Sequence, residues 1–202
     1  MRKTLVLVLL LAAIPAWGQQ RFDATLQAAL NLCQVDGDDA GHYNHLGLRA
    51  GVSTSFTLTP DTRSPWRLEV GVAYSAKGSQ MNYRDGEIAL QYVELPILMT
   101  YNAMDGHLRI GAGVAPAVNV GTKVTFNGIS SPNHEATYRP GDWIPFTVLL
   151  RYRFTDHLGI EGRWQTSLVS ITSGTATGTY RLWRSNKGTF NRLLSIGLTY
   201  QF

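Results

Sequence analysis

The sequence of 202 residues contains a single cysteine, Cys33, so an internal disulfide cannot form. Charged residues are also scarce, at 16% of the chain, whereas a typical soluble domain carries about 25%. The formal net charge of +4 falls to +2 once the two positive charges of Arg2 and Lys3 are removed. Such a small surplus gives no basis for nucleic-acid binding. The low content of charged residues argues against a soluble domain, which usually carries more charge on its surface.

Long hydrophobic runs are missing as well. The longest begins at Leu5 and ends at Ile14, and a membrane-spanning helix needs about 20 apolar residues. Two basic residues precede this run, and Ala16-Trp17-Gly18 follows it, which is typical of a secretory signal peptide. We predict a signal peptide at residues 1–18 and one mature domain at 19–202. The exported chain is then either soluble or inserted into a membrane as strands.

The rest of the sequence alternates apolar and polar residues with a period of two, which predicts β-strands. The last segment is the clearest, because five apolar side chains share one face: Leu194, Ile196, Leu198, Tyr200 and Phe202. With this segment, eight are expected in total, at about 22–32, 46–58, 66–75, 88–101, 108–115, 144–154, 158–168 and 194–202. An antiparallel barrel whose two chain termini lie on the same side of the membrane needs an even number of strands, as found here.

The connections between these segments alternate in length. Long polar stretches are expected at about 33–45, 78–87, 121–141 and 172–190, and short ones at 60–64, 102–106 and 155–157. A three-residue turn at 155–157 keeps Phe154 and Leu158 on one face and places Arg151 opposite Glu161. The pattern predicts an all-β fold: an eight-stranded antiparallel up-and-down transmembrane β-barrel with short periplasmic turns and long outer loops, in the bacterial outer membrane.

The two faces of the strands distinguish a membrane barrel from a soluble, lipocalin-like barrel. One face consists mostly of Gly, Ala, Ser and Thr, which fit the narrow interior of eight strands. The other face has almost no charge and is rimmed by aromatic residues: Trp66, Tyr74, Tyr101, Tyr152, Phe154, Tyr200 and Phe202. This arrangement favours a lipid-facing exterior with aromatic girdles.

Isolated charges are predicted on the inward face, mostly in its periplasmic half: Arg49, Glu69, Glu94, Arg109, Arg151, Arg153, Glu161 and Arg163. Buried charges must be paired, so we expect a salt-bridged polar plug with Glu94 and Arg163 as its central pair. An ion or proton path, or a gate, is the functional alternative. Eight strands leave no open channel of the porin kind.

The segment Gln91-Tyr92-Val93-Glu94-Leu95-Pro96-Ile97-Leu98 resembles the fourth strand of the PorT-like outer-membrane β-barrel family, which typically reads Tyr-Leu-Glu-Ile-Pro-Leu-Leu. The resemblance extends over essentially the whole mature chain, with Tyr92, Glu94 and Pro96 as the motif. It implies insertion by the barrel-assembly machinery, with Tyr200 and Phe202 as an assembly signal, and a weak link to components of type IX secretion. It identifies no catalytic residue. Pro96 lacks an N–H and is expected to mark a bulge or bend.

Two further function classes remain as alternatives. A lipid-modifying or proteolytic membrane enzyme would need a nucleophile with His and carboxylate partners, and no His lies within a predicted strand core beside Ser and an acid. A surface-binding protein would use aromatic and basic residues of the long loops: Tyr138, Tyr180, Arg181, Trp183, Arg184 and Lys187.

We expect no cofactor. The first outer loop holds Asp36, Asp38, Asp39, His42 and His45, but their spacing matches no calcium-loop pattern, so no metal site is predicted. The expected surroundings are outer-membrane lipids and lipopolysaccharide.

Overall fold

The computed structural model describes residues 22–36, 43–58, 64–81, 86–173 and 188–202. The predicted signal peptide lies outside these residues, as do five of the six loop residues proposed for binding; only Tyr138 lies within them. In the described part of the chain, no helix is long and apolar enough to cross a membrane.

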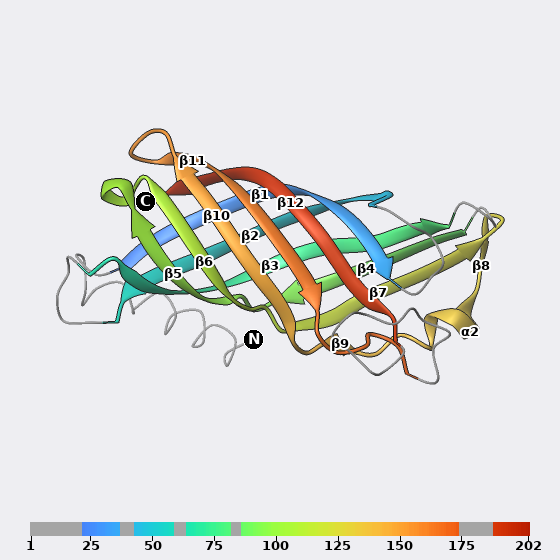
Figure 1. Ribbon diagram of the computed structural model, residues 1–202. Helices are drawn as coiled ribbons and strands as arrows, with labels where there is room; N and C mark the ends of the chain where they lie inside the picture. The colour runs from blue at the N-terminus through green and yellow to red at the C-terminus, as the bar shows by residue number, and fades with distance from the viewer. Residues whose placement is uncertain (1–21, 37–42, 59–63, 82–85, 174–187) are drawn as a thin grey trace, which may run out of the picture.

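Eight antiparallel strand paths form a closed barrel (Figure 1). Five paths are single strands: β1 (Phe22–Asp36), β2 (His45–Thr57), β3 (Trp66–Met81), β11 (Leu158–Ser167) and β12 (Phe190–Gln201). Three paths are divided into β4 (Gly86–Glu94) and β5 (Ile97–Ala103), β6 (Leu108–Val114) and β7 (Ala117–Phe126), and β9 (Gly141–Asp142) and β10 (Pro145–Arg153). The first and last strands pair, with Leu26 opposite Tyr200. The predicted fold class is therefore confirmed.

The described short connections, after β5 and after β10, lie at one end of the barrel, and β8 and α2 lie at the other (Figure 1). The turn between β10 and β11 has the expected parity, since Phe154 N–H donates to the carbonyl of Leu158 at 3.0 Å. Arg151 is opposite Glu161, as predicted. Another periplasmic connection contains a short 3-10 helix, η2 (Met104–Gly106). On the outer side, β8 (Ile129–Ser130) and the one-turn helix α2 (Pro132–Glu135) follow β7.

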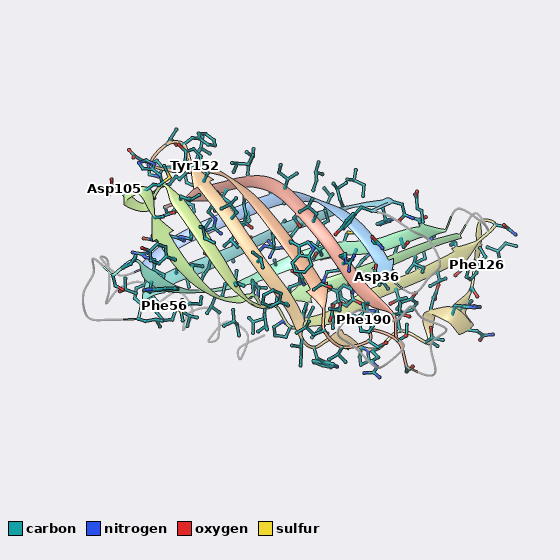
Figure 2. All side chains as sticks on the ribbon, viewed as in Figure 1. Asp36, Phe56, Asp105, Phe126, Tyr152 and Phe190 are labelled. Atoms are coloured by element: carbon teal, nitrogen blue, oxygen red, sulfur yellow. The ribbon has the colours of Figure 1, made fainter. Side chains whose placement is uncertain are left out.

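The exterior is apolar across the membrane band (Figure 2). The row that begins at Leu194 alternates as predicted, and its last member, Phe202, is 67% exposed. Aromatic side chains meet at the periplasmic rim: the ring centroids of Trp66 and Tyr101 are 5.1 Å apart, and those of Tyr200 and Phe202 are 5.0 Å apart. The apolar rings of all four residues and the polar tips of Trp66, Tyr101 and Tyr200 suit the boundary between lipid and water.

Several strands continue farther outward than the alternation indicated. The prediction ended strand one at residue 32, strand three at 75 and strand five at 115, whereas these paths run to Asp36, Met81 and Phe126. Cys33, the first residue after the predicted strand one, is therefore a buried residue inside β1. Beyond the lipid band the outward residues become polar, for example Gln80 and Lys123, so the sequence loses its period-two signal while the strand continues.

A seam of three prolines crosses neighbouring strand paths at one level. Leu95 N–H donates to the carbonyl of Pro116 at 2.8 Å, and Ala115 N–H donates to that of Pro145 at 3.0 Å. Gly71 N–H likewise donates a hydrogen bond to the carbonyl of Pro96 at 3.0 Å. Each proline accepts a hydrogen bond but has no N–H to donate. The interruption expected at Pro96 is thus shared by three paths, and it separates β5, β6 and β10 from the outer segments β4, β7 and β9.

Candidate functional site

The interior of the barrel contains the charges that the alternation placed there. Seven of the eight predicted residues are buried, with exposed fractions of 6% or less; Arg153 is the exception, half-buried near the periplasmic rim. Sequence reasoning missed two fully buried charges, Lys77 and Asp142. It also missed the half-buried pair Asp23 and Arg67. Lys77 keeps the inward parity of Glu69 on β3, but the predicted strand ended two residues before it.

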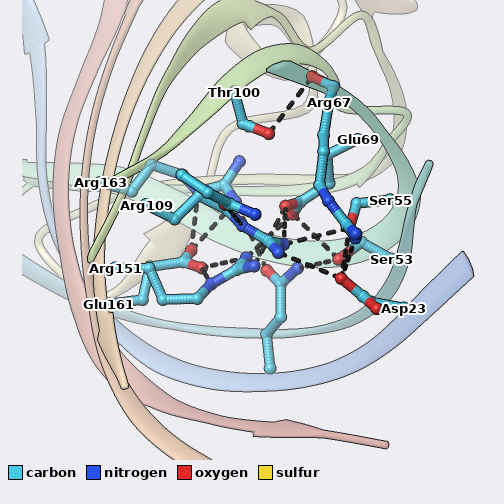
Figure 3. A network of polar contacts seen from close by, with 12 residues as sticks. Asp23, Ser53, Ser55, Arg67, Glu69, Thr100, Arg109, Arg151, Glu161 and Arg163 are labelled. Carbon is cyan, nitrogen blue, oxygen red and sulfur yellow. Dashed lines mark hydrogen bonds and ion pairs between the residues drawn. The ribbon is translucent and has the colours of Figure 1, made fainter. Parts of the chain in front are cut away.

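In the periplasmic half, Arg151 joins two carboxylates (Figure 3). Its Nη2 is 2.9 Å from Glu69 Oε1 and 2.6 Å from Glu161 Oε2. Arg109 extends the network. Its Nη1 lies 3.4 Å from Glu69 Oε2, and its Nη2 lies 3.3 Å from Asp23 Oδ2. Asp23 forms a further ion pair with Arg67. These contacts connect β1, β3, β6, β10 and β11 across the barrel.

At mid-height, Glu94 is held by two cations. Lys77 Nζ lies 2.9 Å from Glu94 Oε1, and Arg49 Nε lies 3.4 Å from Oε2. Arg163 instead pairs with Glu161 at 3.0 Å. The expected pair between Glu94 and Arg163 is therefore wrong. Lys77 comes from the neighbouring strand β3, which pairs with β4, while Glu161 is on the same face of β11 as Arg163.

The outer end of this network is less densely paired. Asp142 Oδ2 accepts hydrogen bonds from Ser167 Oγ at 2.5 Å and Asn191 Nδ2 at 3.3 Å, and lies 4.0 Å from Lys77 Nζ. Lys77 Nζ also lies 4.9 Å from the ring centroid of Tyr92. Farther out, an apolar cluster fills the interior, built from Val35, Ile88, Leu90, Tyr92, Ala117, Val124 and Ile171.

We call the continuous series of interior charges, from Asp142 to Arg67, the charge ladder. It contains Asp142, Lys77, Glu94, Arg49, Arg163, Glu161, Arg151, Glu69, Arg109, Asp23 and Arg67. Gln27 Oε1 links its two parts by accepting from Arg49 at 2.5 Å and Arg163 at 3.5 Å. Because it joins strands that are not neighbours in the sheet, the ladder braces the barrel from within and fills it with side chains.

The motif residues Tyr92, Glu94 and Pro96 occupy distinct positions around this ladder. Tyr92 and Glu94 point inward and both meet Lys77, whereas Pro96 lies at the seam. The motif thus combines a central carboxylate of the ladder, its aromatic neighbour and the break in strand four.

One serine and one histidine are in contact near α2. Ser131 Oγ and His134 Nδ1 are 2.8 Å apart, but both are solvent-accessible residues of the turn around α2, where Ser131 is the residue before the helix. Within the described residues, no three His, Cys, Asp or Glu side chains group as metal ligands would.

A closed eight-stranded barrel with an apolar exterior and a charged interior is an outer-membrane β-barrel protein. A family model described as "Outer membrane protein beta-barrel domain" matches residues 18–173, and the chain belongs to this family. The protein is therefore located in the bacterial outer membrane. The comparison with curated proteins gave no match.

Solved structures of similar fold include three small barrels. Ail, the attachment invasion locus protein of Yersinia pestis, is 11% identical with a TM-score of 0.51, over 90% of this chain and 99% of that one. Neisserial surface protein A is 13% identical with a TM-score of 0.47, over 90% and 97%. OprG from Pseudomonas aeruginosa is 13% identical with a TM-score of 0.44, over 90% and 96%. At 11% identity, the likeness to Ail shows the fold alone.

Proposed function

We propose that this protein is a non-catalytic barrel of the PorT-like kind, which anchors an extension of its sheet outside the membrane for contact at the cell surface. The observation that carries the proposal is the outer extension formed by the ends of β3, β4 and β7 with β8. Figure 1 shows these strands reaching beyond the ends of β10, β11 and β12. An anchor alone would not need strands that continue past the lipid band.

The outer extension packs on the apolar cluster at the outer end of the interior, to which β1 also contributes Val35. Ile88, Leu90 and Val124 are each 2% exposed or less. At its tip, Asn127 and Gly128 have positive φ angles of 50° and 76°, as a tight hairpin turn requires. Ile129 follows and is 73% exposed. We take this exposed apolar side chain as the candidate contact residue of the tip.

The filled interior supports a role at the cell surface rather than in the diffusion of solutes through the barrel. The charge ladder occupies the lower and middle parts, and the apolar cluster closes the outer part. A barrel filled in this way has no open water channel of the porin kind. Non-catalytic character is supported by the solvent-accessible position of Ser131 and His134, the serine–histidine contact described above.

Deletion of the gene, followed by comparison of secreted and surface-exposed proteins, tests the proposal. Complementation with Ile129→Asp should fail to restore the wild-type pattern, although the barrel folds, because the apolar contact at the tip is lost. Met104→Asp is the matched control: Met104 is 65% exposed at the periplasmic end, and this variant should complement fully. Full complementation by both variants would exclude the tip as the contact. A defect confined to secreted proteins would instead indicate the secretion-associated role that the PorT-like resemblance implies.

The aromatic end of β12 leads to a separate prediction about assembly. Phe202→Ala should slow insertion by the barrel-assembly machinery while changing the stability of the folded barrel by only about 1 kcal/mol. The reason is that Phe202 is 67% exposed and its described ring contact is with Tyr200. Pulse-chase measurement of heat-modifiable barrel in cells gives the insertion rate, and thermal unfolding of purified protein gives the stability. A large loss of stability with normal insertion would overturn the assembly role.

A further inference from the structure

The outer extension is an open piece of sheet above a closed barrel, so it has two edges. On one side, β2 pairs regularly with β3 as far as Arg49 and Ser75, whereas β3 continues to Met81. On the other side, the two-residue strand β9 pairs with the beginning of β7, whereas β7 continues to Phe126. The backbone groups at such an edge are a template for pairing with another chain. The extension therefore has two places where a further strand can add.

Asn44, the residue before β2, occupies the edge of β3. Its Oδ1 accepts a hydrogen bond from the N–H of Gln80 at 3.0 Å, and its Nδ2 donates to the carbonyl of the same residue. Ser79 Oγ also donates to Asn44 Oδ1, at 3.3 Å. A side-chain amide has an acceptor and a donor, as a peptide group does. Asn44 therefore takes both backbone groups of Gln80 that an added strand would use.

The segment that follows β7 folds back over the edge of that strand. Val124 N–H donates to Glu135 Oε1 at 3.2 Å, and the carbonyl of Val124 accepts from Ser131 N–H at 2.8 Å. Ser130 Oγ donates to the same oxygen of Glu135 at 3.0 Å. Glu135 belongs to α2, which has no buried residue, so burial does not account for the position of this turn. Its contacts with the edge of β7 do.

We propose that Asn44 and Glu135 are edge caps, which keep the outer extension from pairing with the extension of a second copy of this chain. A second copy is the partner that every such edge has, because two copies that face each other can pair the same edge antiparallel about a two-fold axis. The barrels then lie at opposite ends of the pair, since the extension projects beyond β10, β11 and β12 (Figure 1). A covering segment and a charged side chain both oppose strand addition at an edge. This inference goes beyond the proposed surface role, because it concerns self-pairing and not the contact at Ile129.

Sedimentation of the purified protein in detergent measures self-pairing. The wild-type protein should sediment as a single chain. The double variant Asn44→Ala with Glu135→Ala removes both caps, and it should form a species of two chains whose fraction rises with concentration. Both positions lie outside the membrane band, so the barrel should still form, which the gel shift on heating verifies. A double variant that stays a single chain would overturn the proposal.

Two single variants separate capping from the loss of a charge. Glu135→Gln keeps an oxygen that accepts from Val124 N–H, and it should sediment as a single chain. Glu87→Ala removes a carboxylate of the middle strand β4, whose side chain is 51% exposed, and it should also stay a single chain. Self-association of either variant would assign the effect to charge alone and contradict the capping role.

Hydrogen exchange gives a test that begins with the wild-type protein. The amides of Gln80 and Val124 should be protected although they lie at strand edges, and free exchange at either amide would reject its cap. In Glu135→Ala at low protein concentration, the amide of Val124 should exchange roughly fivefold faster, the effect of losing one hydrogen bond. An unchanged rate would show that Glu135 does not close the edge. Neither result affects the proposed role of Ile129, which complementation measures.

Discussion

Replacing Glu94 with glutamine is expected to destabilise the barrel by about 3–5 kcal/mol, because it leaves two buried cations without their main partner. Glu94 is 1% exposed and lies 2.9 Å from Lys77 and 3.4 Å from Arg49. After the substitution, the nearest carboxylate to Lys77 is Asp142, at 4.0 Å. For a chain of this length, the unfolding temperature should fall by roughly 10 °C. Thermal unfolding in detergent and the gel shift between unheated and heated samples measure the loss.

Glu87→Gln is the matched control for this substitution. Glu87 lies on the same strand, but its side chain is 51% exposed on the outward face and its contact with His45 is 3.9 Å long. Its replacement should change stability by no more than about 0.5 kcal/mol. The double variant Lys77→Met with Glu94→Gln should recover part of the loss, because it removes a charge together with its partner. Unchanged stability of Glu94→Gln with altered ion conductance would contradict a structural ladder and support a gate.

Replacing Gly197 with valine is expected to prevent barrel closure altogether. Gly197 lies on β12 opposite Ala29 of β1, in the pair that closes the barrel. A Cβ atom at this glycine would lie 2.2 Å from the carbonyl oxygen of Ala28 and 2.4 Å from the Cβ of Ala29. The two strands would have to separate within the membrane band, where unpaired backbone groups are not tolerated. The variant should therefore yield no heat-modifiable species and little protein in the outer-membrane fraction.

Gly162→Val separates this steric effect from the general effect of adding a side chain. Gly162 lies on β11, one strand away, and the nearest atom to an added Cβ is the carbonyl oxygen of Leu150, at 3.9 Å. This variant should fold and migrate as the wild-type barrel does. Wild-type migration of Gly197→Val would show that the β1–β12 seam can shift, contrary to this expectation.

Within the ladder, only contacts between adjacent strands were accessible from the sequence. Arg151 and Glu161 flank a three-residue turn, so local parity places them opposite each other, and they form the expected pair at 2.6 Å. The contact between Arg151 and Glu69 joins residues 82 positions apart. It depends on strand tilt and on the reach of side chains across the interior, and alternation specifies neither. The wrong partner assigned to Glu94 has a different origin: Lys77 is on the adjacent strand β3, but the predicted strand ended at residue 75.

The sequence by itself determined that this chain is an eight-stranded outer-membrane barrel, which side of each strand faces lipid, and that charges line the interior. These features follow from period-two alternation and turn length, which are local properties. Only the tertiary structure decided that Lys77 and Asp142 belong to the charge ladder, that three prolines form one seam, and that β3, β4 and β7 extend outward. Those features depend on which residues meet at one height in the closed barrel, and that is set by the register and tilt of strands distant in sequence.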